Sequence, residues 1–338
     1  MSDSPREAQF YDSETTQEYS HTIGSQSSTS TGTINLGGKW GPIRLYREAR
    51  LDNDAACLEW CMQMGLIFSS MDCRRHRRPR TLTIGMDRRP YWYCGSCDDR
   101  KSVMAGSIFG EDSRIPISKA LLLMLGFAHG CTYEEASRYC IMDSRDDDIS
   151  SATISRWYSC FREAVTTNFL NRIHQGSKIG GQDIIVQVDE AMIGRRKYNR
   201  GRLVEGTWVV GMVDSFGDIR LEVCERRDVE NLTDIISRNV EFGSIIHSDS
   251  WRGYSTERLE WAGFRHSTVN HSREFVADDG THTQRIESQW RALRRHFSPG
   301  GIRKEDIADH LLEYAWRRRC VVANEDPFMD LINICRAC

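Results

Sequence analysis

The chain of 338 residues has no apolar run near the roughly 18–20 residues that span a bilayer, so no membrane segment is expected. Its first residues lack a charged and then apolar signal peptide, so we expect a protein that is not secreted. It also lacks an excess of one charge, because 45 Lys and Arg residues face 48 Asp and Glu residues, a net charge of −3. The 12 cysteines are too scattered for a disulfide scaffold, and close Cys and His pairs suggest metal ligands in a reducing compartment instead.

The near-neutral total hides an uneven distribution of charge. Residues 1–39 are rich in Ser, Thr, Gly and Gln and have a net charge of −3, so we expect a disordered tail. Residues 73–101 carry nine basic and three acidic side chains, a local net charge of +6. The total therefore does not argue against a nucleic-acid partner.

Four potential zinc ligands lie within this basic segment, in a module that we expect over residues 40–110 behind a short leading helix. They form two close pairs with strand-like residues 81–84 and 91–93 between them: Cys73 and His76, then Cys94 and Cys97. Two such pairs about 20 residues apart are typical of a zinc ribbon with tetrahedral Zn²⁺. Cys57 and Cys61, at helical spacing, are rival ligands.

Residues 111–175 predict a helical segment. Pro116 begins an apolar run that Gly130 ends, Thr132 and Glu135 fit a capping box, and Ser150 or Ser151 caps a third helix. Short helices separated by tight turns suit a helix-turn-helix for DNA binding, although another small helical bundle would show the same pattern.

From about residue 180 to residue 323 the pattern indicates a mixed α/β domain, followed by a C-terminal tail over residues 324–338. We expect strands over 184–188, 207–213, 219–224 and 244–247, and helices over 229–240, 283–297 and 304–322. Three strands in a row, followed by alternating strands and helices, predict a mixed sheet flanked by helices.

Carboxylates lie at the ends of two of these strands. Asp189 ends a very apolar strand, Asp249 directly follows another, and Glu287 lies on the helix after them. Three such carboxylates are able to hold two Mg²⁺ or Mn²⁺ ions about 3.5–4 Å apart at a phosphodiester. Asp249 is also suited to capping the next segment, and periodicity does not choose between Asp189 and Glu190, which face opposite sides of the strand.

Basic side chains flank these carboxylates and suggest a surface that follows a phosphate backbone, although such runs are more often only solvated. Two groups are candidate DNA-binding residues: Arg195, Arg196, Lys197, Arg200 and Arg202, and then Arg291, Arg294 and Arg295. On the helix of the second group, Ile286, Trp290, Leu293 and Phe297 form an apolar stripe that predicts a core face.

Several ordered blocks between about residues 180 and 320 resemble the ISXO2-like transposase domain of the IS1595 insertion-sequence group and its eukaryotic Merlin relatives. The blocks are residues 183–194 with the basic run 195–202, then 247–254, 269–275 and 280–290. The resemblance implies an RNase H-like fold with a catalytic triad of Asp189, Asp249 and Glu287, which selects Asp189 over Glu190. His282 falls in the last block and is similar in position to an auxiliary residue near the scissile phosphate, with a capping or packing role as the alternative.

The resemblance implies a DDE transposase that cuts DNA at transposon ends and transfers the strands into target DNA. Its expected partners are terminal inverted repeats, target DNA and further copies of the chain, without a small-molecule substrate. The basic run 195–202 resembles the Merlin side, so a nuclear location is expected if the element is eukaryotic. The alternatives are a domesticated DNA-binding protein without transposition and an RNase H-type nuclease.

Overall fold

The structure is a computed structural model that describes residues 39–84, 90–111, 113–142, 148–193, 206–269, 282–297 and 302–336. All of them lie in one unit, Gly38–Cys338. Most of the predicted N-terminal tail and the basic run over residues 195–202 fall outside the described residues.

The segment over residues 40–110 begins with two helices, α1 (Pro42–Glu48) and α2 (Asp54–Gln63). A three-stranded antiparallel sheet in the order β1-β2-β3 follows, composed of Thr81–Ile84, Pro90–Cys94 and Asp99–Ser102. The first two strands are those that the sequence predicts. The third pairs with β2 and returns the chain past the turn that carries Cys97.

The three predicted helices of the next segment are confirmed as α3 (Ile117–His129), α4 (Tyr133–Tyr139) and α5 (Ser151–His174). Apolar residues lie all around α3, and it is accordingly buried. Gly130 ends it with φ of 70°, a conformation that favours glycine. Both hydrogen bonds of the capping box between Thr132 and Glu135 are present, and Ser150 caps α5.

Two further helices, α9 (Ile307–Val322) and α10 (Pro327–Ile334), pack with this helical layer although they come from the C-terminal end of the chain. Trp316 of α9 stacks on Phe127 of α3 with ring centroids 6.0 Å apart. The predicted C-terminal tail is corrected here, because Phe328, Leu331 and Ile332 bury the apolar face of α10.

The second half of the chain forms a five-stranded mixed sheet in the order β10-β9-β5-β6-β7. Strand β6 pairs antiparallel with both β5 and β7, whereas β9 pairs parallel with both β5 and β10. The strands are Ile185–Ile193 (β5), Thr207–Asp214 (β6), Ile219–Cys224 (β7), Ile245–Asp249 (β9) and Arg265–Val269 (β10). A separate parallel pair joins β4 (Ile179–Gly180) to β8 (Val240–Glu241).

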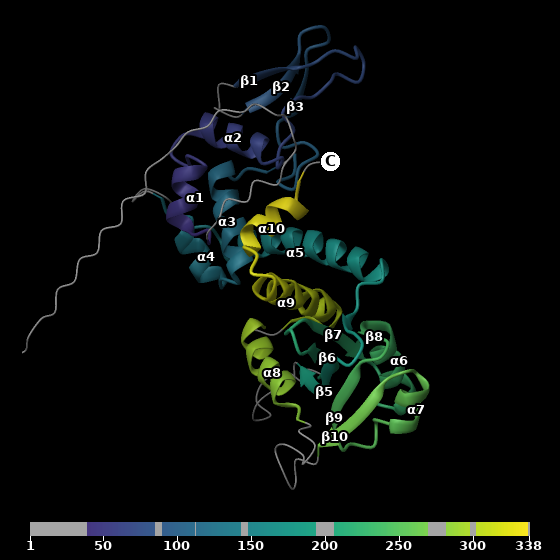
Figure 1. The fold of residues 1–338 in the computed structure, drawn as a ribbon. Helices are drawn as coiled ribbons and strands as arrows, with labels where there is room; N and C mark the ends of the chain where they lie inside the picture. The colour runs from purple at the N-terminus through teal and green to yellow at the C-terminus, as the bar shows by residue number, and fades with distance from the viewer. Residues whose placement is uncertain are drawn as a thin grey trace, which may run out of the picture. The chain divides into compact units, whose positions relative to one another are not determined.

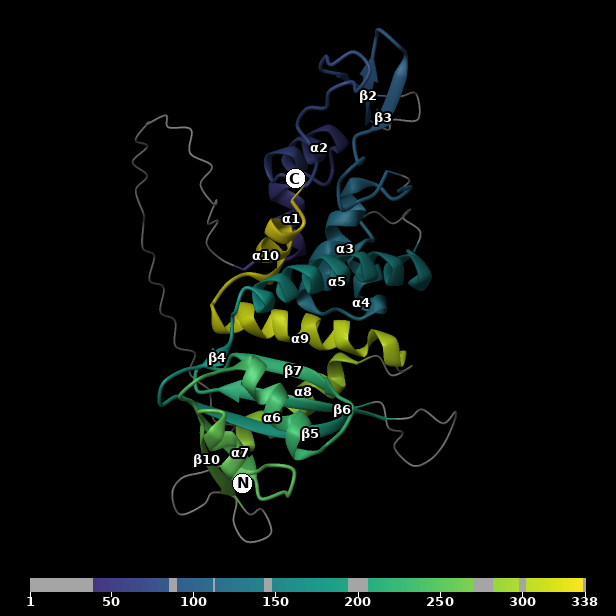
Figure 2. The ribbon, with the colours of Figure 1, turned by 90° about the vertical axis from the view of Figure 1, so that its right-hand side faces the viewer.

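Helices cover both faces of the five-stranded sheet (Figures 1 and 2). On one face, α6 (Val229–Asn239) and α7 (Thr256–Trp261) enclose a core with side chains such as Val186, Val188 and Ile246. On the other face, α8 (Gln284–His296) packs on β5 and β6, and α9 runs along β7. The predicted mixed α/β domain is therefore confirmed, and helices cover its sheet on both faces.

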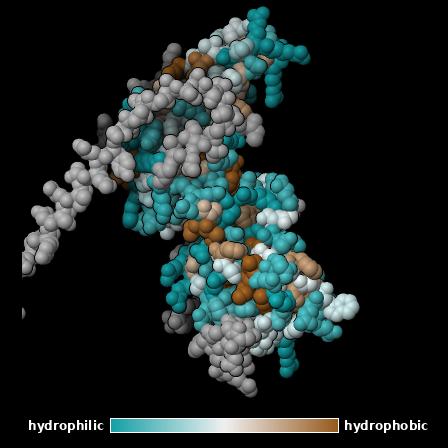
Figure 3. All heavy atoms as spheres, viewed as in Figure 1, coloured by the Kyte–Doolittle hydropathy of each residue, from teal (hydrophilic) through white to brown (hydrophobic). Residues whose placement is uncertain are grey.

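The described surface carries mainly hydrophilic side chains around β1–β3, at the upper end of the view in Figure 3. Arg74, Arg75, Arg77 and Arg78 are exposed there, whereas Arg80 is buried and donates to Asp99 at 2.5 Å. Among the described helices, none has both the length and the apolarity that a bilayer crossing requires.

Candidate active site and zinc centre

The parallel pairing of β5 with β9 brings Asp189 and Asp249 together. Gln187 lies opposite His247 in this pairing, and the two aspartates follow two residues later on each strand. Since side chains alternate along a strand, Asp189 shares a face with Gln187 and Asp249 shares one with His247. The charge of Asp249 contributes to the raised pKa of Asp189, which is consistent with this proximity.

Asp189 lies partly buried beneath α8. Burial raises the pKa of this carboxyl to about 6, although the indole of Trp290 donates a hydrogen bond of 2.8 Å to its Oδ2 atom and acts in the opposite direction. A raised pKa means that the surrounding protein does little to stabilise the negative charge of the ionised carboxylate. Such groups are typical of functional sites. A divalent cation would supply the missing positive charge.

Asp249 caps the turn after β9, which is the alternative role that the sequence indicates for it. Its Oδ1 atom accepts a hydrogen bond of 3.1 Å from the backbone N–H of Trp251. This bond holds the carboxylate in one orientation at the end of β9. Capping the turn and binding a metal are compatible roles, because a metal-binding carboxylate is normally fixed by a hydrogen bond of this kind.

Glu287 reaches this region through the docking of α8 on β5. The Oε1 atom of buried Gln187 accepts hydrogen bonds from the backbone N–H groups of Arg285 at 2.9 Å and Ile286 at 3.3 Å. These N–H groups lie in the first turn of α8 and have no partner within the helix. A side chain of β5 thus caps the helix that carries Glu287.

Gln187 also fixes His282. Because Oε1 of Gln187 accepts two N–H groups, its Nε2 atom is the donor to Nδ1 of His282, at 3.1 Å. The neutral ring therefore carries its proton on Nε2, where it is available as a donor. The Oε1 atom of Glu287 accepts from Thr283 at 2.8 Å, one residue after His282.

Asp189 lies in the middle of β5, because this strand continues past the predicted end to Ile193, whereas Asp249 ends β9 and Glu287 lies in the first turn of α8. Among the described residues, the ligand atoms of Asp189, Asp249 and Glu287 do not all lie within 4.8 Å of one another. A two-ion site does not require this, because each ion about 3.5–4 Å from the other is held by a different subset of ligands. The arrangement is able to hold divalent cations through hard oxygen donors.

Glu190, the rival of Asp189, points to the opposite face of β5. It accepts a hydrogen bond of 2.8 Å from Nη2 of Arg227 and another from the hydroxyl of Tyr254, and its side chain is 3% exposed. The structure thus places Glu190 in a buried ion pair and Asp189 beside α8.

The basic residues of α8 are accessible. Arg291, Arg294 and Arg295 are exposed beyond Glu287 on the same helix. The basic run Arg195, Arg196, Lys197, Arg200 and Arg202 lies outside the described residues.

Two residues of the site were not predicted from the sequence. Trp290 is buried as the apolar stripe of α8 predicts, but it also donates to Asp189. Gln187 is polar in an otherwise apolar strand, two residues before Asp189 and therefore on the same face. That alternation was the available signal for Gln187, whereas the role of Trp290 depends on how α8 lies against β5.

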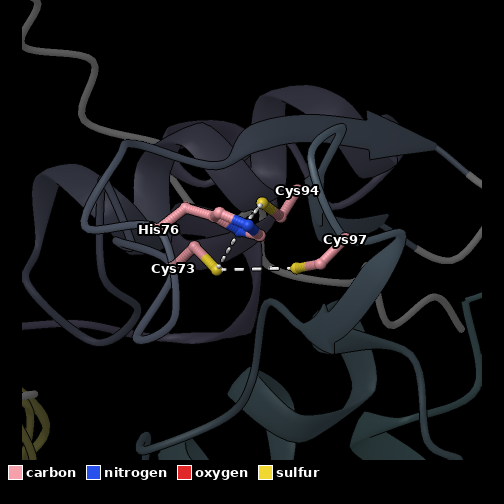
Figure 4. Close-up of side chains that lie close together, drawn as sticks. All are labelled: Cys73, His76, Cys94 and Cys97. Carbon is pink, nitrogen blue, oxygen red and sulfur yellow. Dashed lines mark hydrogen bonds between the residues drawn. The ribbon is translucent and has the colours of Figure 1, made fainter.

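The four predicted zinc ligands converge in the N-terminal segment (Figure 4). The Sγ atom of Cys73 lies 3.7 Å from Sγ of Cys97 and 3.6 Å from Nδ1 of His76, which lies 3.6 Å from Sγ of Cys94. Tetrahedral Zn²⁺ with Zn–S bonds of about 2.3 Å and a Zn–N bond of about 2.0–2.1 Å requires separations of about 3.8 Å and about 3.6 Å. The cluster therefore fits zinc, and the rival Cys57 and Cys61 lie apart from it on α2.

A second group, His296, His310 and Glu313, also brings three ligand atoms within 4.8 Å. Both carboxylate oxygens of Glu313 already accept hydrogen bonds of 2.5 Å, one from Arg162 and one from Arg317. Two guanidinium charges beside one carboxylate oppose a further cation. We interpret this group as a structural link between α5, α8 and α9.

A mixed sheet with one carboxylate within β5 and another at the end of the adjacent β9 defines an α/β domain with a candidate metal-dependent active site. Residues 178–318, which contain this whole sheet, match the family model described as the ISXO2-like transposase domain. The resemblance that the sequence indicates is thereby confirmed for this part of the chain.

No curated protein matches the chain. The search of solved structures returned the "Crystal structure of a pre-cleavage Mos1 transpososome", with 8% sequence identity and a TM-score of 0.24, covering 64% of this chain and 97% of that chain. At this identity and score the two chains share no more than a loose likeness.

Proposed function

We propose that the chain is a DDE transposase whose RNase H-like domain uses Asp189, Asp249 and Glu287 to cleave DNA at transposon ends and to transfer the strands into target DNA. The observation that carries this proposal is the parallel pairing of β5 with β9, which puts two carboxylates on neighbouring interior strands of the sheet, beneath the helix of the third. The match of residues 178–318 to a transposase domain supports it. The sheet order, with three antiparallel strands followed by two parallel ones, agrees with the RNase H-like fold that the resemblance implies.

The residues of the site have distinct roles in this proposal. Asp189, Asp249 and Glu287 would hold two Mg²⁺ or Mn²⁺ ions, which when bound activate the attacking oxygen and stabilise the leaving oxygen. Trp290 orients Asp189, and the backbone of Trp251 orients Asp249. His282, with its proton on Nε2, would donate a hydrogen bond to a phosphate oxygen near the scissile bond.

Basic side chains outside the triad would hold the DNA. Arg291, Arg294 and Arg295 continue α8 beyond Glu287, so a backbone lying along this helix would pass the carboxylates. The Cys73, His76, Cys94 and Cys97 cluster would hold structural Zn²⁺ in a basic module that contributes to the binding of transposon ends. Since transposition joins two ends, we propose that the chain acts as a homo-oligomer.

The triad is tested with Asp189→Asn and Asp249→Asn in the full chain, on duplex DNA that carries the terminal inverted repeats flanking the gene. We expect Mn²⁺-dependent cleavage to fall at least ~100-fold, because bound metal contributes several kcal/mol to the transition state. Binding of the ends, measured by gel shift, should remain close to the parent.

Asp234→Asn is the matched control, because Asp234 is exposed on α6 and its substitution removes the same charge at a place away from the site. It should retain cleavage and end binding. Parental cleavage in either triad variant would disprove the assignment. Cleavage without strand transfer in the parent would favour the nuclease alternative, and end binding without cleavage would favour a domesticated DNA-binding protein.

A further inference from the structure

A buried network lies on the face of β5 opposite Asp189. Glu190 accepts from Arg227, which comes from the turn between β7 and α6, and from Tyr254, which follows β9. The guanidinium carbon of Arg227 lies 3.9 Å from the ring centroid of Trp208 and 4.1 Å from that of Trp251. Arg227 is thus held between two indole rings while it pairs with Glu190.

This network is joined directly to Asp249. Trp251, whose ring stacks on Arg227, donates its backbone N–H to Oδ1 of Asp249 at 3.1 Å. Tyr254 contacts the same ring edge to face, with centroids 6.2 Å apart, and donates its backbone N–H to the carbonyl of Trp251 at 3.1 Å. Trp251 therefore contacts Arg227 through its ring and Asp249 through its backbone N–H group.

The glycine at position 253 allows the Trp251 ring to lie where it does. A Cβ atom at this residue would lie 1.7 Å from Cζ3 of Trp251, so the ring folds over a backbone position that no larger residue is able to occupy. The turn after β9 thus directs Trp251 toward Arg227.

We infer that Arg227 is a positioning residue that fixes Asp249 relative to Asp189, an inference that rests on the proposed function. One side of Arg227 is tied to Glu190, the residue next to Asp189, and the other lies against Trp251, which holds Asp249. The guanidinium thereby sets the separation between the middle of β5 and the turn after β9, because its ion pair fixes it to β5 and its flat face fixes that turn. Groups that orient metal ligands in this way determine metal affinity without touching the metal.

The test measures Mn²⁺ binding to the full chain without DNA, by the electron paramagnetic resonance signal of free Mn²⁺. Arg227→Met keeps the length of the side chain and removes its charge, and we expect it to weaken Mn²⁺ binding roughly 10- to 100-fold. The Mn²⁺ concentration that half-saturates cleavage should rise by a similar factor, with a smaller change in the rate at saturating Mn²⁺. Arg227→Lys, which restores the charge but not the flat face, should recover part of the affinity.

A second variant separates positioning from folding. Trp251→Leu keeps both partners of the ion pair between Arg227 and Glu190 and removes the ring that contacts Arg227 and Tyr254, so it should also weaken Mn²⁺ binding at least ~10-fold. Arg238→Met is the matched control, because Arg238 pairs with Glu222 between α6 and β7 and not with the carboxylate strands. It should lower thermal stability at most and leave Mn²⁺ affinity at the parental value.

The outcomes distinguish this inference from the proposed function. If Asp189→Asn binds Mn²⁺ as the parent does, the metal assignment of the proposed function is wrong. If Asp189→Asn loses Mn²⁺ while folded Arg227→Met and Trp251→Leu bind it with parental affinity, the proposed function stands and the positioning role is overturned.

Discussion

Gly211 gives the sharpest test of how the fold positions the third carboxylate. It lies on β6 directly opposite Asp189 of β5, beneath α8. A Cβ atom at Gly211 would lie 2.5 Å from Cη2 of Trp290 and 2.8 Å from Cδ1 of Ile286. Atoms do not approach so closely, so Gly211→Ala must displace the Trp290 ring or the whole helix.

The size of the effect follows from these distances. Carbon atoms need a separation of about 3.5–4.0 Å, so the ring must retreat by about 1 Å. The hydrogen bond from Trp290 to Asp189, now 2.8 Å, would then be weakened or lost. Overpacking of this kind costs about 1–3 kcal/mol, which corresponds to a fall in melting temperature of about 2–10 °C.

The catalytic effect should exceed the effect on stability. Glu287 lies on the same helix as Trp290, so a shift of α8 by about 1 Å moves a proposed metal ligand by a similar distance. Misplacement on this scale lowers rates by roughly 100-fold. We therefore expect Gly211→Ala to remain folded at 25 °C and to cleave DNA roughly 100-fold more slowly.

Thermal unfolding and Mn²⁺-dependent cleavage should be measured together. Gly41→Ala is the matched control, because a Cβ atom there meets nothing within 4 Å and φ is −142°. It should retain the rate and lose at most ~2 °C in melting temperature, because Gly41 is the N-cap of α1 and Ala is a poorer N-cap than Gly. If Gly211→Ala loses stability but cleaves at the parental rate, the proposed dependence of the site on the packing of α8 is refuted. If it also retains the parental melting temperature, the close packing is itself refuted.

The remaining predictions concern zinc and pH. The purified chain should contain one zinc ion, held by the cluster of Cys73, His76, Cys94 and Cys97. The Cys94→Ser variant should lose this zinc, whereas Cys57→Ser should keep it. Metal analysis that finds no zinc in the parent would exclude the site. Burial raises the pKa of Glu313, but the charges of Arg317 and Arg162 outweigh this and hold it at about 2, below its ordinary value of 4.5. The contribution of ionised Glu313 to the free energy of unfolding is therefore present above about pH 4.5 and lost as the pH falls toward 2. Glu313→Gln should lower the free energy of unfolding by about 3–5 kcal/mol at pH 7 and flatten its dependence on pH in acid. An unchanged acid dependence in this variant would contradict the role of that carboxylate.

Strong local patterns predicted most of the elements. The apolar run after Pro116 and the stop at Gly130 correspond to α3, and the capping box of Thr132 and Glu135 forms as its spacing indicates. Strand β10 was missed because Arg265–Val269 has few apolar residues and only Val269 is buried. Helix α10 was missed because it is short and packs through contacts with helices far away in the sequence.

The sequence by itself determined the candidate chemistry: the residue types and ordered blocks that indicate the transposase domain, and the paired Cys and His residues that fit zinc. These features depend on residue identity and short spacing, which are visible in one dimension. Tertiary structure decided which groups orient the carboxylates. Gln187 caps a helix that begins 97 residues later, and Arg227 links Glu190 to the turn that holds Asp249. Gly211 is required only because α8 lies against β6. Such roles arise from the parallel pairing of β5 with β9 and the docking of α8, and no local pattern encodes either contact.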